Sequence, residues 1–523
     1  MIRKRNTAGL LSGAIYLTAS TILVKVIGML YKVPMSYILS DEGMGYFNAA
    51  YTVYSLLYLL GTAGVPKAIT VLVSKYNAEG KEARAERVFT LASRVFFCIG
   101  ACLCILLMIF AAPLSYLIGS PNATPSLIMI APSLIFVCLG GVYRGYLTAY
   151  KEFSCCAIAA LIEALGKLLL GLFFLFCGLQ FGLPLSWLCA LCVLGIAVGS
   201  FGSLIYLHVN IKLKENKDIV EQKCTFGENR SLVASIFKIA IPITVGSLAA
   251  GISSVIDLSM IMRCLENSGM TESEAAAVYG NYTTLAVPML QMAISLVTPI
   301  AVVILPTVSS YYARKDMECF RDHMGLASEL CAVISWPIAA VFFFFPYETL
   351  CILFQSDSAS LCAPLLRALA LGVILFSVLL LLNTALESMG RPKLQMVSML
   401  AGILVKICVS RAFLQDQNFG IMGAPIGTVF GYGASLILSL IFVCLVKGGI
   451  SAIVKKQLYP CLCSVSAILI TLFIGNRFFD RGGVSRISSI SILFVFCTIY
   501  LILLYFTGVF RVEKIKKLSK QPI

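Results

Sequence analysis

The sequence has few charged residues and almost no histidine. Lys, Arg, Asp and Glu make up only 12% of the 523 residues, and His208 and His323 are the only two histidines. There is no His-Glu-x-x-His motif for a catalytic metal, and no Gly-rich loop ending in Gly-Lys-Ser/Thr for a nucleoside triphosphate. The longest polar segment, Asn210 to Arg230, is too short to form a catalytic domain. We therefore predict that the protein is not an enzyme and holds neither a metal nor a cofactor.

Apolar residues dominate the composition. The chain is 59% hydrophobic with a mean hydropathy of +0.94, which is typical of an all-α polytopic membrane protein. Because about 20 apolar residues span a bilayer as a helix, the apolar runs predict about fourteen transmembrane helices. These are expected near residues 9–39, 46–73, 88–112, 125–148, 153–178, 184–208, 233–262, 276–306, 325–346, 364–388, 394–414, 422–446, 457–476 and 488–509.

The basic residues are distributed unevenly between the loops. With 40 Lys and Arg against 25 Asp and Glu, the formal net charge is +15. Most of the basic residues fall in loops on the N-terminal side of the membrane, whereas the opposite side receives Arg263, Arg411, Arg477, Arg481 and Arg486. The positive-inside rule then predicts a multi-pass plasma membrane protein with both termini in the cytoplasm. Since the basic residues act as topology determinants, no nucleic-acid partner is expected.

An internal repeat divides the first twelve spans into two groups of six. The stretch Gly45 to Tyr76 is similar to Asn281 to Tyr312, and Lys167 in IEALGKLLLG corresponds to Lys406 in AGILVKICVS. The offsets, 236 and 239 residues, indicate a duplicated six-span unit in parallel orientation; chance likeness between apolar segments is the alternative. We predict an N-terminal lobe (1–208), a cytoplasmic linker (209–232), a C-terminal lobe (233–446), and two additional spans with a basic tail (447–523).

The first span carries two lysines within its apolar run. Lys25 falls near mid-depth of the bilayer and Lys32 toward the far end. Seven residues is close to two helical turns, which puts both ammonium groups and the intervening Gly28 on one face. Because a charge at this depth costs about 3 kcal/mol, we predict that this face lines a polar cavity and binds substrate. Snorkelling is the alternative, and it suits Lys32 better than Lys25.

Four further charged residues lie inside predicted spans and form a candidate cavity or ion-coupling set. Glu163 and Lys167 are four residues apart, which favours an intrahelical ion pair that is either structural or lines the pathway. Asp257 either pairs with a cation from another helix, such as Lys25, or takes up a proton or sodium ion. Lys406 lies similarly deep. Snorkelling is expected of the charged residues nearer the span ends, which are Lys67, Arg94, Arg144, Glu329, Arg367 and Arg411.

The run from Val24 to Tyr76 contains the segments KVIG, DEGMG and AGVP. It resembles the opening of the stage V sporulation protein B and polysaccharide-transport family, and weaker likenesses follow at SSVIDLSMI from Ser253 and TPIAVVILPTVSSYYA from Thr298. That family is similar to lipid II flippases and shares a superfamily with multidrug and toxin extruders. The resemblance implies two six-helix lobes around a central cavity, two additional C-terminal helices, and alternating access of a lipid-linked sugar.

The resemblance also implies roles for particular residues. Lys25 matches a basic residue that lines the cavity of lipid II flippases, and Lys32 approximates a second one, displaced by one position. Asp257 matches an acidic position common in the sporulation-type branch. Where the flippases carry an arginine in helix eight, this sequence has Asn281, Tyr282 and Thr283, so lipid II itself is not specified.

These observations predict a flippase or exporter for a polyprenyl-pyrophosphate-linked oligosaccharide, either lipid II or a related envelope precursor. Its partners would be this anionic lipid-linked sugar, the bilayer, and a coupling proton or sodium ion. The alternative is an ion-coupled extruder of drugs or organic cations with the same fold. Such an extruder is expected to place carboxylates in its cavity, whereas the first span offers two lysines. A membrane-embedded glycosyltransferase would need a substantial external loop, and the longest external loops are about a dozen residues.

Overall fold

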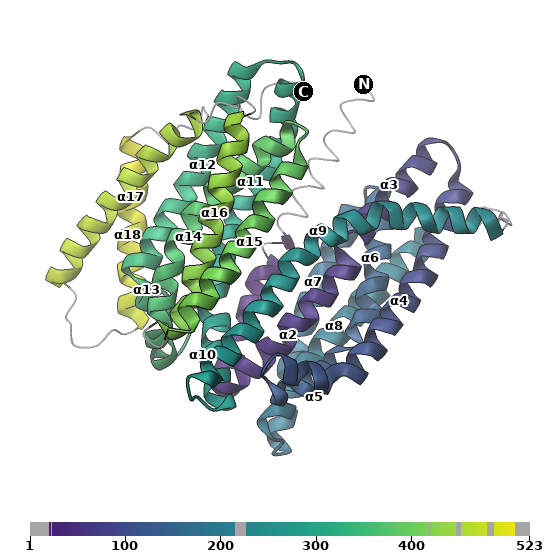
Figure 1. The fold of residues 1–523 in the computed structure, drawn as a ribbon, viewed down its shortest axis with the longest axis horizontal. Helices are drawn as coiled ribbons and strands as arrows, with labels where there is room; N and C mark the ends of the chain where they lie inside the picture. The colour runs from purple at the N-terminus through teal and green to yellow at the C-terminus, as the bar shows by residue number, and fades with distance from the viewer. Residues whose placement is uncertain are drawn as a thin grey trace. The chain divides into compact units, whose positions relative to one another are not determined.

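The computed structural model is built from long helices (Figure 1). It describes residues 20–507 except 22, 215–225, 417–418, 446–450 and 479–485, and no strand occurs within these residues. A helix satisfies its backbone hydrogen bonds internally, which apolar segments require inside a bilayer. The start of the first expected span, the centre of the expected linker and the basic tail lie outside the described residues.

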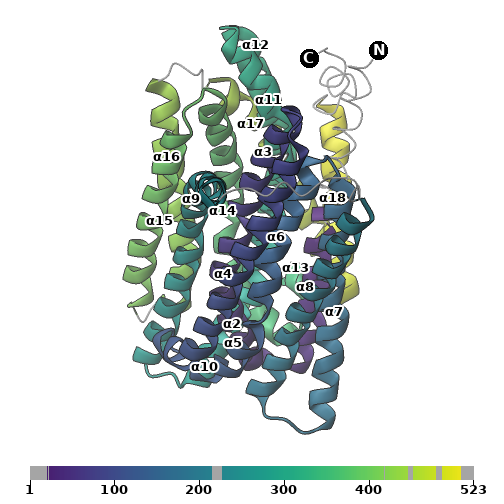
Figure 2. The same ribbon diagram turned by 90° about the vertical axis from the view of Figure 1, so that its right-hand side faces the viewer.

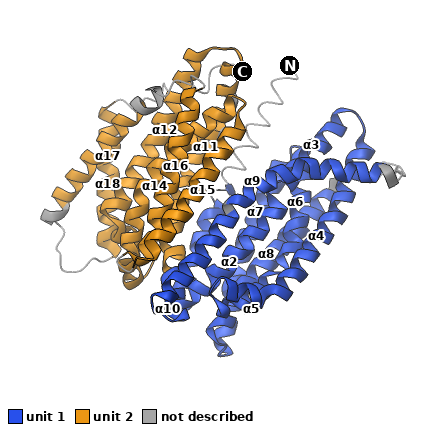
Figure 3. Ribbon diagram, viewed as in Figure 1, with its two compact units in different colours: residues 1–280 blue, residues 281–523 orange. Residues whose placement is uncertain are grey.

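The chain divides into two compact units, Met1–Gly280 and Asn281–Ile523 (Figure 3). Unit 1 begins with a helix that covers residues 23–38. It continues with α2 (Ser40–Thr62), α3 (Val65–Ala78), α4 (Glu82–Leu117), η1 (Pro121–Ala123), α5 (Thr124–Ile130), α6 (Ser133–Ala149), α7 (Phe153–Gln180), α8 (Leu185–Lys214), α9 (Phe226–Asn267) and α10 (Glu272–Asn281). The seventh expected span corresponds to α9, which packs against α2 and α3 and therefore belongs to this unit.

Unit 2 opens with a π-helical segment, η2 (Tyr282–Ala286), which runs into the next helix. The helices that follow are α11 (Val287–Ala313), α12 (Met317–Phe344), α13 (Pro346–Cys351), α14 (Ser356–Ser388), α15 (Pro392–Leu414), η3 (Gly420–Met422), α16 (Gly423–Leu445), α17 (Ser451–Phe478) and α18 (Arg486–Phe506). The division of the chain into lobes at 1–208 and 233–446 stays a prediction.

Twelve of the described helical segments are long and apolar enough to cross a membrane. A thirteenth forms if α5 and α6, which meet at a 44° bend, are counted as one span. The class of fold predicted from the sequence, an all-α polytopic membrane protein, is confirmed, and the expected number of fourteen is approximate. The first expected span is not among the thirteen because only part of it is described.

The two units contain equivalent helix pairs, α7 with α8 and α15 with α16, which lie side by side (Figure 2). Each pair follows a turn with a positive φ angle, at Lys151 (63°) and at Gly390 (71°), and these turns are 239 residues apart. A glycine brings each pair together. A Cβ atom added at Gly199 would lie 2.8 Å from the carbonyl oxygen of Glu163, and one at Gly431 would lie 2.9 Å from that of Gly402. Glu163 and Gly402 are 239 residues apart, the offset of the two turns, whereas Gly199 and Gly431 are 232 apart. The offset of the predicted repeat is therefore kept by the first helix of each pair and not by the second.

Polar contacts fasten α17 to α12 within unit 2. The Trp336 indole donates a hydrogen bond to Gln457 Oε1 at 2.9 Å, and Gln457 Nε2 donates to Ser328 Oγ at 3.0 Å. Lys456 forms an ion pair with the buried Glu329 at 3.2 Å. The expected snorkelling of Glu329 is therefore wrong, because its side chain is only 8% exposed and forms an ion pair with a cation on α17.

Candidate functional site

The first helix, α2 and α7 bring polar side chains together inside unit 1. Lys32 Nζ donates a hydrogen bond to Asn48 Oδ1 at 3.1 Å, and the Asn48 amide donates to the Met44 carbonyl at 2.8 Å. Asn48 is buried, so its side chain is fixed by these two bonds in a setting where an unsatisfied amide would be costly. Lys32 is half-buried, and its positive charge lies close enough to Lys167 of α7 for the two to interact.

Lys167 contacts two tyrosine rings. Its Nζ atom lies 5.2 Å from the ring centroid of Tyr31 and 4.5 Å from that of Tyr51. Both distances are within the range of a cation–π contact, each worth about 0.5–2 kcal/mol. The electron-rich ring faces stabilise the ammonium group without neutralising it. We refer to Lys32, Asn48, Lys167, Tyr31 and Tyr51 as the lysine–tyrosine cluster.

Tyr31 is held rigidly by α7 and α8. Its fully buried hydroxyl donates a hydrogen bond to the Cys192 carbonyl at 2.8 Å. Gly171 leaves the room for the ring, since a Cβ atom there would lie 2.6 Å from the Tyr31 hydroxyl oxygen. Gly195 lets α8 approach, because its Cβ would lie 2.4 Å from Gly171 Cα. Close helix packing through glycine thus positions the ring that contacts Lys167.

Lys25 and Gly28 lie on the same helix as Lys32. The side chain of Lys25 is exposed on the surface of the described chain, and a Cβ atom at Gly28 would meet nothing within 4 Å. Gly28 therefore does not mediate a close helix contact within the part of the chain that the structure describes. The substrate-binding roles of Lys25, Gly28 and Lys32 stay predictions.

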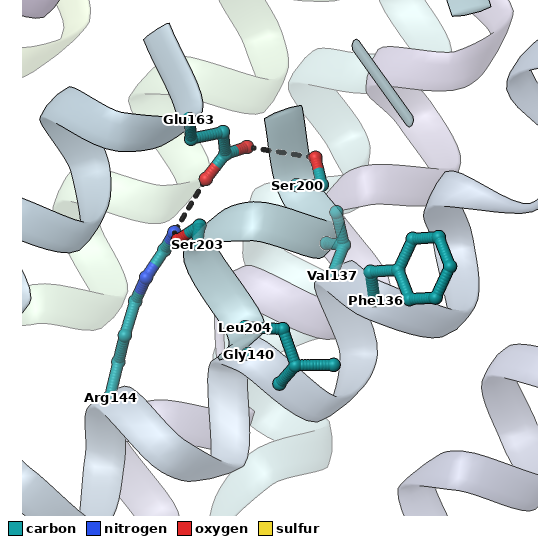
Figure 4. A pocket seen from close by; sticks show the side chains of 8 residues that line it. All are labelled: Phe136, Val137, Gly140, Arg144, Glu163, Ser200, Ser203 and Leu204. Atoms are coloured by element: carbon teal, nitrogen blue, oxygen red, sulfur yellow. Dashed lines mark hydrogen bonds and ion pairs between the residues drawn. The ribbon is translucent and has the colours of Figure 1, made fainter. Parts of the chain in front are cut away.

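The predicted ion pair between Glu163 and Lys167 is wrong. Glu163 instead pairs with Arg144 of α6 (Figure 4). Lys167 contacts the rings of Tyr31 and Tyr51. A guanidinium from a neighbouring helix offers a planar donor array to the carboxylate, which the flexible ammonium four residues away does not. The expected snorkelling of Arg144 is wrong for the same reason, since its side chain is only 23% exposed and is engaged by Glu163.

The Arg144–Glu163 pair borders a small cavity between α6, α7 and α8. Ser200 donates a hydrogen bond to Glu163 Oε1 at 3.4 Å, and Arg144 Nη2 donates to Ser203 Oγ at 3.3 Å (Figure 4). The cavity is about 10 Å³, which is close to what a single water molecule needs. It is therefore too small for a drug-sized or sugar substrate.

Asp257 belongs to unit 1 and Lys406 to unit 2. Asp257 is half-buried on α9, and its charge acts on the buried Tyr279, whose hydroxyl lies 3.1 Å from Thr52 Oγ1. Lys406 is on α15 in unit 2, where a Cβ atom at Gly431 would lie 2.8 Å from Lys406 Cβ. The coupling roles of both residues stay predictions.

The apolar helices and the relatives described below place the chain among multi-pass membrane transporters of the flippase and exporter class. The chain belongs to the family described as Polysaccharide biosynthesis protein (Polysacc_synt), whose profile matches residues 10–312. The MatE profile also matches, over residues 242–410.

Two proteins of Bacillus subtilis (strain 168) resemble the chain along most of its length. It is 21% identical to Stage V sporulation protein B over 518 residues, which cover 98% of each chain. It is 20% identical to Lipid II flippase MurJ over 452 residues, or 83% of this chain and 82% of the relative.

Solved transporter structures share the fold. An inward closed conformation of Lipid II flippase MurJ superimposes with a TM-score of 0.72 at 17% identity, covering 95% of this chain and all of that structure. An inward-facing multidrug resistance MATE family transporter of the MOP superfamily gives a TM-score of 0.63 at 15% identity, covering 83% of this chain and 99% of the other. The class of fold that the resemblance implies, that of the lipid II flippases and MATE-like transporters, is thereby confirmed.

Proposed function

We propose that this chain is a flippase that moves a polyprenyl-pyrophosphate-linked oligosaccharide from the cytoplasmic to the outer leaflet by alternating access. The substrate would be lipid II or a related cell-envelope precursor. The lobes would be residues 1–208 and 233–446, joined by the linker 209–232, with residues 447–523 adding two helices. The protein would lie in the plasma membrane with both termini in the cytoplasm, because the positive-inside rule puts the basic loops on that side.

The observation that carries the proposal is the chemistry around Lys32. Its ammonium group is half-buried and donates a hydrogen bond to Asn48 Oδ1, and its charge interacts with that of Lys167. A pyrophosphate bridge carries two negative charges and needs such cations to cross the apolar core. The polyprenyl tail, by contrast, has no need to leave the lipid. The names of the relatives that the chain resembles support this substrate class.

The test is complementation of bacteria depleted of their own lipid II flippase. We expect the wild-type chain to restore growth and lipid II export. Lys25→Ala and Lys32→Met should fail at equal membrane abundance, and Lys25→Arg should retain part of the activity. Rescue by all variants alike would remove the two lysines from the site. Failure of an abundant wild-type chain would exclude lipid II and direct the assay to other lipid-linked sugars.

An ion-coupled extruder of drugs or organic cations is the second candidate. It is favoured by the MatE match over residues 242–410, which contains Asp257. A cation substrate needs carboxylates along its path, whereas the first helix and α7 present lysines in the cluster described above. Export of a fluorescent organic cation by the wild-type chain, lost in Asp257→Asn and retained in Lys32→Met, would support this candidate over the flippase.

A further inference from the structure

Lys167 is a cation that the protein has stabilised without neutralising. Among the residues that the structure describes, no carboxylate forms an ion pair with Lys167, because the acidic residue one turn before it, Glu163, is bound to Arg144. Its contacts are the faces of Tyr31 and Tyr51, which attract the ammonium group but carry no net charge. A structural lysine in a membrane protein would more simply be matched by a carboxylate, as Lys456 is by Glu329.

Lys167 and Lys32 are two like charges held near one another. They interact electrostatically. Lys167 contacts the two tyrosine rings, and Lys32 donates a hydrogen bond to the Asn48 side chain. Holding two cations together in a low-dielectric setting is unfavourable, and an anion between them removes the repulsion. A doubly charged anion removes more of it than a singly charged one, and a neutral molecule removes none.

The supporting structure is built to keep Lys167 in place. Tyr31 is fully buried, is anchored by its hydrogen bond to Cys192, and fits against the bare backbone of Gly171. Tyr51 stacks on the fully buried Phe47 with ring planes 8° apart and centroids 5.9 Å apart. Two rigid rings therefore restrict an otherwise flexible side chain, which lowers the entropy lost when an anion binds.

We infer that Lys167 is a second anion-binding residue beside Lys32, that Tyr31 and Tyr51 position it, and that together the two lysines bind one diphosphate. This inference rests on the proposed function and adds to it the residue that gives preference for a diphosphate over a monophosphate. Lys25, which is exposed on the same helix as Lys32, is not needed for that preference.

The experiment measures binding of three lipids to the purified full-length chain in detergent: undecaprenyl pyrophosphate, undecaprenyl monophosphate and undecaprenol. We expect the wild type to bind them in that order of decreasing affinity. Lys167→Met should weaken binding of undecaprenyl pyrophosphate by about tenfold and change undecaprenol binding little. The ratio of the affinities for the pyrophosphate and the monophosphate lipid should therefore fall. Lys167→Arg should retain most of the preference. The exposed Lys75→Met on α3 is the matched control and should behave as wild type.

Variants of Tyr51 test whether its ring positions Lys167. Tyr51→Phe keeps the ring and should keep the preference, whereas Tyr51→Leu should weaken pyrophosphate binding several-fold. In a Lys167→Met background, Tyr51→Leu should cause no further loss, which a general folding defect would not reproduce.

The outcomes separate the inference from the proposed function. Unchanged pyrophosphate preference in Lys167→Met would overturn the inference and leave the flippase proposal standing. Equal binding of all three lipids by the wild type would overturn both.

Discussion

Arg144 of α6 and Glu163 of α7 form an ion pair that joins two neighbouring helices of unit 1. Their side chains are 23% and 20% exposed, and Ser200 and Ser203 of α8 hydrogen-bond to the same pair. Three helices are thus connected by one polar cluster. The pair also explains why Lys167, four residues after Glu163, is available to the tyrosine rings.

Removing one member of this pair should be worse than removing both. Glu163→Gln or Arg144→Met leaves a charge without its partner, and each should lower the free energy of unfolding by about 2–3 kcal/mol. The double variant should lose clearly less than the sum of the two, because no charge is left behind. Thermal unfolding of the purified chain in detergent measures this. Strictly additive losses would show that the two groups do not interact in the folded protein.

Gly431 and Gly433 offer a matched pair of substitutions on one helix. A Cβ atom at Gly431 would lie 2.8 Å from Lys406 Cβ, whereas one at Gly433 would meet nothing within 4 Å. Gly431→Ala should therefore push α16 away from α15 and destabilise the protein by about 1–3 kcal/mol. Gly433→Ala should be neutral or slightly stabilising, since alanine favours a helix. Equal melting temperatures for the two variants would contradict the close packing.

The contact between α17 and α12 depends on Gln457, and fluorescence can report on it. The chain has two tryptophans, so a Trp187→Phe background leaves Trp336 as the single emitter. Gln457→Leu removes the acceptor of the Trp336 indole and the donor to Ser328, which should cost about 1–3 kcal/mol and shift the emission to shorter wavelength. Ser328→Ala, which removes the partner of Gln457 Nε2 and leaves the indole acceptor in place, is the control and should leave the emission nearly unchanged. An unshifted spectrum in Gln457→Leu would argue against this hydrogen bond.

The fold class could be predicted from the sequence because bilayer thickness sets the length of every apolar run. Helix ends were less predictable. The expected linker from residue 209 to 232 is helical at both described margins, since α8 continues to Lys214 and α9 begins at Phe226. Polar residues continue a helix beyond the membrane without interrupting its hydrogen bonds, so hydropathy alone does not mark where the helix stops.

The pairing of charges inside the membrane was not predictable from spacing. Glu163 and Lys167 have the ideal separation for an intrahelical pair, yet Arg144, 19 residues before Glu163, is its partner. That choice depends on which helices are neighbours, which is tertiary information. Tyr31, Asn48 and Tyr51 were missed as site residues because tyrosines and a single asparagine in an apolar run look like ordinary membrane-helix composition. The available signal was that they share the opening segment with Lys32.

Asp257 provides the test of ion coupling. It lies half-buried on α9, and its charge acts on the buried Tyr279 of α10. A change in the charge of Asp257 would therefore be felt by a neighbouring helix of unit 1. In liposomes containing the purified chain and a labelled polyprenyl-pyrophosphate sugar, we expect an imposed proton or sodium gradient to accelerate transport. Asp257→Asn should abolish that acceleration, because a neutral amide neither takes up a proton nor attracts sodium, and Asp257→Glu should retain part of it.

Binding of undecaprenyl pyrophosphate should be unchanged in Asp257→Asn, which separates coupling from substrate recognition. Gradient-dependent transport by Asp257→Asn at the wild-type rate would place the coupling site elsewhere.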